Sequence, residues 1–279
     1  MGYLILAICS SAMISIVMRF SEKKVRHNIA MLVMNYTMCS LLGLVFAGAE
    51  RVSSFSDPGL LKTVGFGIVN GGLYLISFVL FQRNIQRSGV VLSAIFMKLG
   101  LLVTMVVSVC VYGETPGMYQ GIGFVLAVGA IVCINAPARG SSGRFGVGLP
   151  VLLLCGGMAD AMSKIFEQSG VPGMDDAFLF YTFCVALILC IGLMVRKKQR
   201  VGKWEMLFGL LIGVPNFLST KFLLRALEAV PAVIAFPVYS VGGILVVTLA
   251  GVFVFREKLR KHQWTALGII LAALVLLNL

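Results

Sequence analysis

Charged side chains are scarce in this sequence. They make up 12% of the 279 residues, and only 11 residues are acidic. A soluble domain has about 25% charged residues, so the composition excludes an ordinary soluble globular protein. The hydrophobic share is 59% and the mean hydropathy is +1.00. Several apolar runs reach the ~20 residues that a bilayer-spanning helix requires. The chain is therefore predicted to be an all-α integral membrane protein.

Catalytic and metal-binding patterns are also missing. Neither His27 nor His262 has a partner at metal-ligand spacing, and no two of the seven cysteines form a CxxC motif. There is no GxxxxGK[ST] phosphate loop and no recognisable set of nucleophile, base and orienting residue. We therefore expect no enzymatic activity, no metal and no cofactor. No basic segment or cleavage pattern marks a signal peptide, so we expect the first apolar run to be retained.

Short polar breaks divide the apolar sequence into ten predicted membrane-spanning helices. A span of ~17–25 residues crosses a bilayer. The predicted spans are residues 2–20, 29–48, 60–81, 89–111, 118–135, 147–168, 177–195, 204–226, 231–255 and 263–279.

The basic residues are distributed unevenly between the connections. In or next to the connections after odd-numbered spans there are 17 Lys and Arg residues, and in or next to those after even-numbered spans there are three, namely Arg51, Lys62 and Arg225. Cytoplasmic loops are enriched in Lys and Arg. The pattern predicts that the odd-numbered connections are cytoplasmic and that both termini face away from the cytoplasm. The net charge of +12 is thus interpreted as a topology signal, and we expect no nucleic-acid binding.

The second half of the sequence repeats the first. A shift of 143 residues places Glu114 and Gln120 on Glu257 and Gln263, and a shift of 142 aligns "FGIVNG" (66–71) with "FGLLIG" (208–213). The predicted organisation is a first five-helix repeat at 1–138, a linker at 139–146 and a second five-helix repeat at 147–279. A repeat with an odd number of spans inserts in the opposite orientation. The halves are therefore predicted to be inverted repeats, as in many secondary transporters.

These features resemble the drug/metabolite transporter superfamily, and within it the tandem EamA-domain family. The resemblance rests on the five-plus-five arrangement, on the repeated Glu and Gln, and on "RALEAVPAVIAFPVYSVGGIL" (225–245), which contains Pro237 and Val238. The first half departs from the pattern, because Ala94 stands where the second half has Pro237. The resemblance covers nearly the whole chain and implies transport of a solute, without selecting which one.

The repeated residues themselves are interpreted as structural. A carboxylate near a helix start complements the helix dipole, so Glu114 and Glu257 are expected to cap helices. Gln120 and Gln263 are expected to form hydrogen bonds between helices. Four glycines at four-residue spacing indicate close helix packing; they are Gly67, Gly71, Gly209 and Gly213.

Polar residues inside the spans are the candidates for a binding site. Lys98 is about nine residues into its span, or ~14 Å deep, close to the middle of a ~30 Å hydrocarbon core. A charge at that depth costs at least ~2.5–3.5 kcal/mol, so such residues usually face a cavity or a partner. The predicted solute-binding residues are Lys98, Asp160, Lys164, Lys221, Asn70, Tyr74, Asn216 and Tyr239.

Two alternatives apply to the charged candidates. Lys164 and Lys221 are near the ends of their spans, where a lysine can extend its ammonium to the interface. Asp160 and Lys164 are four residues apart and can neutralise each other on one helix face.

The leading hypothesis is a secondary transporter that moves a small anionic or zwitterionic metabolite by alternating access, with a coupling ion or an exchanged solute. The alternatives are a lipid-linked substrate flippase or a flippase subunit, and a cationic drug exporter that uses Asp160. A membrane enzyme or receptor would require long soluble loops or a nucleophile set, and neither is seen. We expect a multi-pass protein of the plasma membrane, namely a bacterial inner membrane, present as a monomer or homodimer.

Overall fold

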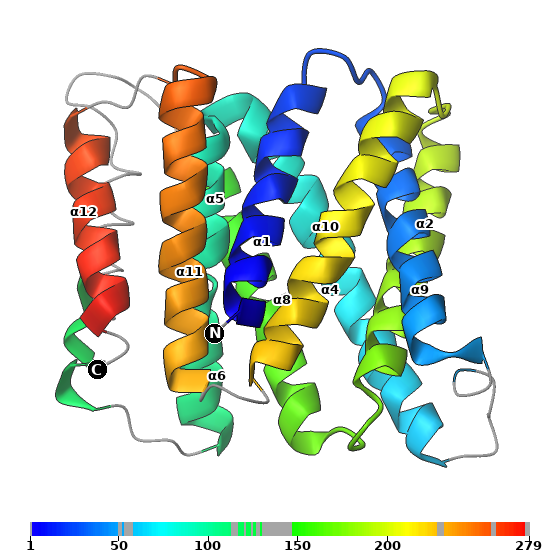
Figure 1. The fold of residues 1–279 in the computed structure, drawn as a ribbon, viewed down its shortest axis with the longest axis horizontal. Coiled ribbons are helices and arrows are strands. Elements are labelled where there is room, and N and C mark those ends of the chain that lie inside the picture. Colours follow the sequence, from blue (N-terminus) through cyan, green and yellow to red (C-terminus); the bar gives the residue numbers. More distant parts are fainter. Residues whose placement is uncertain are drawn as a thin grey trace.

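The computed structural model describes residues 2–49, 52, 58–112, 117–119, 121–123, 125–126, 129, 147–227, 232–257 and 261–276. Its regular elements are all helical (Figure 1). They are α1 (Gly2–Ser21), α2 (Asn28–Ala47), α4 (Pro58–Ser88), α5 (Val90–Lys98), α6 (Leu101–Tyr112), α8 (Gly148–Ser169), α9 (Asp175–Arg196), α10 (Lys203–Leu227), α11 (Ala232–Leu249), the π-helix η1 (Ala250–Val254) and α12 (Lys261–Leu276).

Six of these helices are long and apolar enough to cross a membrane, namely α1, α2, α4, α8, α9 and α10. The molecule is therefore a multi-pass helical membrane protein. The predicted fifth span and the predicted linker at 139–146 lie largely or wholly outside the described residues. The exact number of ten spans consequently stays a prediction.

The predicted fourth span, 89–111, is not one continuous helix. It is divided into α5 and α6, with a break at Leu99 and Gly100. The break lies against α8, where a Cβ atom on Gly100 would be only 2.8 Å from the Cα of Gly157. Two backbones meet there, so the contact depends on residues without side chains.

The four-residue glycine spacing serves helix packing, as predicted. Gly67 and Gly71 of α4 lie against α9, where a Cβ atom on Gly71 would be 2.6 Å from the carbonyl oxygen of Thr182. Gly209 and Gly213 of α10 lie against α2, where a Cβ atom on Gly213 would be 2.7 Å from the carbonyl oxygen of Asn35. The same small-residue contact is thus made twice, once by each half of the chain.

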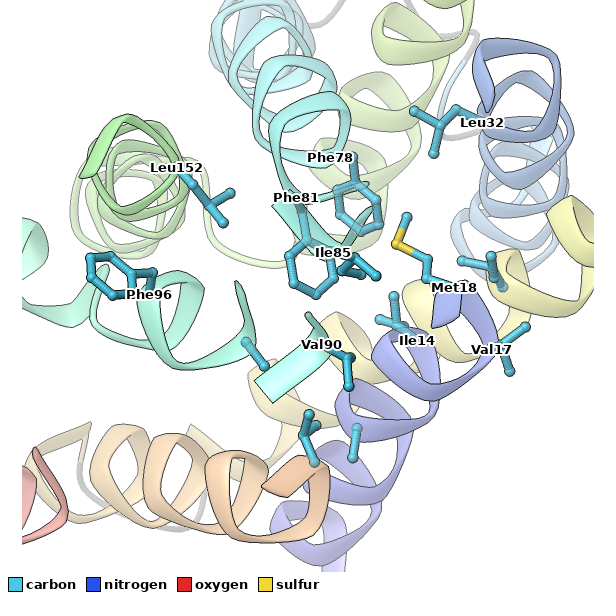
Figure 2. Close-up of a cluster of buried hydrophobic side chains, with 14 of the residues drawn as sticks. Ile14, Val17, Met18, Leu32, Phe78, Phe81, Ile85, Val90, Phe96 and Leu152 are labelled. Atoms are coloured by element: carbon cyan, nitrogen blue, oxygen red, sulfur yellow. The ribbon is translucent and has the colours of Figure 1, made fainter. Parts of the chain in front are cut away.

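The helix contacts exchange partners between the two halves. Helix α1 packs on α10 and α11, while α8 packs on α4 and α5; α2 and α9 pack on each other. Figure 2 shows part of the resulting core, in which α1, α4, α5 and α8 contribute Met18, Phe81, Val90 and Leu152. The first and second halves are therefore intertwined, and each helix at the centre contacts the other half.

One end of the bundle carries most of the described basic residues, and we call it the basic end. The last turns of α1, α4 and α9 there contain Arg19, Arg87 and Arg196. Lys24, which follows α1, lies over the ring of Trp204 at the start of α10, at 4.6 Å from the ring centre. The start of α1 and the end of α12 lie toward the opposite end (Figure 1).

Candidate functional site

A cavity of about 120 Å³ lies between the two halves of the chain. Helices α1, α4 and α5 line it from the first half, and α8, α10 and α11 line it from the second. Its polar lining residues are Ser11, Ser15, Tyr74, Ser77, Lys98, Asp160, Ser163, Lys164, Asn216, Ser219, Thr220 and Tyr239. Six of the eight predicted binding residues are thus brought to one cavity.

Lys98 is the last residue of α5, immediately before the helix break. Its Nζ atom lies 3.5 Å from the centre of the Tyr239 ring, which belongs to α11 in the other half. Its aliphatic stem passes Gly243, where a Cβ atom would be 3.0 Å from the Lys98 Cε. The aromatic face and the negative end of the α5 dipole both stabilise the ammonium group.

Asp160 reaches the same cavity from α8. It is accessible to solvent and lines the cavity, and its carboxylate interacts electrostatically with Lys98. Gly157, three residues earlier on α8, is the residue that contacts the helix break at Gly100. The break and its small-residue contact therefore bring a cation from one half near a carboxylate from the other. Lys164 lies one turn further along α8 and also lines the cavity; its neutralisation of Asp160 stays a prediction.

Hydroxyl groups form the rest of the polar wall. The hydroxyls of Ser219 and Tyr239 share a hydrogen bond of 2.9 Å, and those of Tyr74 and Thr220 share one of 3.4 Å. The Asn216 amide nitrogen donates to the Asn35 side-chain oxygen at 3.2 Å, so this amide joins the cavity to the α2–α10 contact. The sequence does not single out Ser219 or Thr220, because small hydroxyl residues in an apolar helix more often serve packing.

Two predicted binding residues lie elsewhere. Lys221 forms an ion pair with Asp176 at 2.6 Å, and its Nζ atom lies 4.1 Å from the centre of the Phe46 ring. Asn70 is fully buried and donates to the Thr182 hydroxyl at 3.4 Å, within the α4–α9 contact. Neither residue is among those that line the central cavity, because each is held by a residue of α9; their role in solute binding stays a prediction.

Lys221 instead lines a second pocket of about 420 Å³ near the end opposite the basic end. The turn between α8 and α9 lines this pocket together with Asp175, Asp176 and Arg225. Leu224 lines both the second pocket and the central cavity. The two spaces are therefore neighbours.

Glu257 caps a helix of the other half of the chain. Its Oε1 accepts a hydrogen bond from the Val90 backbone amide at 2.9 Å, and its Oε2 accepts one from the Val91 amide at 3.3 Å. It thereby caps the start of α5, across the contact between the halves. Glu114, Gln120 and the Gln263 side chain lie outside the described part of the structure, so their expected roles stay predictions.

A model of the EamA-like transporter family matches residues 1–136 and again residues 149–279. The chain belongs to the EamA-like transporter family. A membrane transporter function follows from that membership, and the tandem match agrees with the resemblance seen in the sequence.

Individual relatives add detail about the family. An uncharacterized protein of Haemophilus influenzae is 27% identical over 71% of this chain and 69% of its own length. A probable 4-amino-4-deoxy-L-arabinose-phosphoundecaprenol flippase subunit ArnE of Proteus mirabilis is 30% identical over 36% of this chain and 96% of its own. The ArnE protein of Photorhabdus laumondii, of the same description, is 30% identical over 34% and 90%.

A solved structure supports the fold alone. It is a crystal structure that is 13% identical in sequence, covers 98% of this chain and 94% of its own, and superposes with a TM-score of 0.65.

Proposed function

We propose that this EamA-family protein is a secondary transporter of a small organic metabolite that carries an anionic group, alone or together with an ammonium group. The observation that carries the proposal is the meeting of Lys98 and Asp160 in one cavity between the halves, with Lys98 over the Tyr239 ring. Charged residues at membrane depth are expensive and usually mark a solute or ion pathway. A pair with one member from each half suits a site that both halves contact.

The roles follow from charge and position. Lys98 binds the anionic group of the solute, and Lys164 supports it from further along α8. Asp160 binds an ammonium group of the solute or takes up a proton. Two lysines against one carboxylate among the described lining residues favour an anionic or zwitterionic solute over a cationic drug. Ser219 and Thr220 provide neutral hydrogen-bond partners around the charges.

The transport cycle rests on the two repeats. We propose that residues 1–138 and 147–279 are inverted repeats joined by the linker 139–146, and that they rock about the cavity to expose it to one side at a time. The exchanged helix contacts and the duplicated glycine contacts support this arrangement. The basic end faces the cytoplasm of a bacterial inner membrane, and a coupled ion or exchanged solute drives the cycle.

A lipid-linked flippase is the second candidate function. The ArnE relatives support it, because the substrate in their description joins an amino sugar to a phosphate on a polyprenol. Such a head group is zwitterionic, and in a flippase its phosphate pairs with Lys98 and its amine with Asp160. The matches cover only about a third of this chain, which makes a free metabolite the first choice.

A thermal-shift screen of the purified protein tests the proposal, because a ligand that binds the folded state raises its apparent stability. The panel contains amino acids, carboxylates, sugar phosphates, polyprenyl phosphates and cationic drugs. We expect a stabilising hit among the anionic or zwitterionic solutes, followed by uptake of that solute in proteoliposomes. A hit confined to polyprenyl phosphates would select the flippase. Stabilisation by cationic drugs alone would overturn both functions.

A further inference from the structure

Glu257 joins the two halves at the basic end. It follows η1 in the second half, and its carboxylate accepts hydrogen bonds from Val90 and Val91 of the first half at 2.9 and 3.3 Å. Arg19 of α1 lies 3.4 Å from the same carboxylate and also forms an ion pair with Glu22. A hydrogen bond to a charged acceptor is stronger than a hydrogen bond between neutral groups, and this carboxylate accepts two. One side chain therefore connects η1, α1 and α5.

The backbone around this contact contains glycines at close approaches and residues with positive φ angles. Gly89 has φ +86°, and a Cβ atom there would be 2.9 Å from the Glu257 carboxylate. A Cβ atom on Gly251 would collide with the Val91 side chain. Arg256, next to Glu257, has φ +52°, which is uncommon for a residue with a side chain. The π-helix before it is of a kind often found at functional sites.

The capped helix carries the main cation of the proposed solute site. Helix α5 has nine residues, with Val90 at its start and Lys98 at its end, a separation of about 12 Å along the helix axis. The helix is a short, regular segment between its cap and the break at Gly100. Glu257 and the Lys98 ammonium therefore lie at opposite ends of the same short helix.

We propose that Glu257 is a positioning residue and a releasable latch: while it caps α5 it holds Lys98 in place and keeps the cavity closed at the basic end. This rests on the proposed transport function. The opposite end differs, because the second pocket of about 420 Å³ lies there beside the cavity and shares Leu224 with it. Breaking the Glu257 cap lets α5 tilt on the Gly100–Gly157 contact and opens the cavity toward the basic end.

The chain provides a matched control at the same end. The Oε1 atom of Glu205, at the start of α10, accepts hydrogen bonds from the Arg26 and His27 amides at 2.9 and 3.1 Å. Glu205 thus also places a carboxylate of the second half on two backbone amides of the first half. Its target is the segment before α2, which does not line the cavity. A purely structural role predicts equal behaviour of the two glutamates.

The test measures which side of the membrane reaches the cavity. A cysteine is placed on the cavity wall by Ser163→Cys, in a background whose seven native cysteines are replaced. A second reporter, Lys198→Cys, marks the basic end. Both are labelled with a membrane-impermeant thiol reagent in right-side-out and inside-out vesicles. The readout needs no transported solute, so it can succeed or fail independently of the proposed function.

We expect the cavity cysteine of the parent protein to be labelled from the face opposite Lys198→Cys. Glu257→Gln should raise its labelling rate from the basic face roughly tenfold, because a charge-assisted cap is lost, while Glu205→Gln leaves it unchanged. Val90→Pro removes one of the two donor amides at a helix position that accepts proline and should act in the same direction. Equal labelling in Glu257→Gln, Val90→Pro and Glu205→Gln would overturn the latch, as would free access from the basic face in the parent protein.

Discussion

The contacts between the halves and the cavity between them are built by different rules. The packing positions are duplicated: Gly67 and Gly71 of α4, which pack against α9, correspond to Gly209 and Gly213 of α10, which pack against α2. The charged cavity positions are not. In the register that relates the halves, a shift of 146 residues places Asp160 on Ile14 and Lys164 on Met18, and a shift of 143 places Lys98 on Val241.

This difference has a physical reason. Each backbone contact exists twice in the bundle, so a side chain would collide at either copy and both must stay small. The cavity exists once, near the centre of the arrangement. A single cation and a single carboxylate suffice there, and a second copy of each would add the cost of another charge in the membrane. A symmetric scaffold can therefore hold an asymmetric site.

The strongest test of this contrast removes the charge of Lys98. Lys98→Ala should reduce uptake to background and abolish the ligand-induced thermal shift, while expression and folding remain near normal. The exposed Lys62 at the start of α4 is the matched control, and Lys62→Ala should leave uptake unchanged. Full uptake by Lys98→Ala in proteoliposomes would remove this residue from the site.

The second test addresses the duplicated contacts. Gly71→Ala and Gly213→Ala should each lower the free energy of unfolding by ~1–3 kcal/mol, the usual effect of overpacking. The neighbour Gly72 has nothing within 4 Å of an added Cβ atom, so Gly72→Ala should be neutral or slightly stabilising. Thermal unfolding in detergent measures all three. A large loss in only one of the two halves would show that the contacts are not equivalent.

Much of this organisation is accessible from the sequence, for identifiable reasons. Hydropathy and glycine spacing are local patterns, so the helical membrane class and the packing role of Gly71 and Gly213 can be predicted. Depth within a span draws attention to Lys98 and Asp160, and the structure places both at the cavity. Their role in binding stays a prediction.

Other features depend on tertiary contacts and have no local signal. The break at Leu99 and Gly100 lies against the backbone of Gly157. A single glycine in an apolar run does not predict a helix break. The depth argument cannot reveal that Lys221 meets Asp176, 45 residues away in the sequence. The cap that Glu257 forms on α5 is likewise a non-local contact. From the sequence alone, a glutamate near a helix start is expected to cap that helix, so the contact with α5 cannot be predicted.

The third test concerns the carboxylate of the cavity. Asp160→Asn should weaken uptake roughly tenfold, since a hydrogen bond to a charged group contributes ~1.5–3 kcal/mol. It should also change the pH dependence of uptake, because a titratable group is removed. If Asp160 and Lys164 only neutralise each other, either single substitution destabilises the protein and the double substitution restores it. An unchanged pH profile in Asp160→Asn would exclude proton uptake by this residue.

The smallest effect is expected at Lys221, outside the central cavity. Its side chain is 11% exposed and that of its partner Asp176 is 28% exposed. Ion pairs near a surface contribute about 0–1 kcal/mol, so Lys221→Met should lower the free energy of unfolding by less than about 1 kcal/mol and leave uptake within a factor of roughly two. A double-mutant cycle with Asp176→Asn measures the coupling directly. If Lys221→Met instead abolishes uptake while the cycle shows little coupling, the second pocket takes part in solute binding, and the site extends beyond the central cavity.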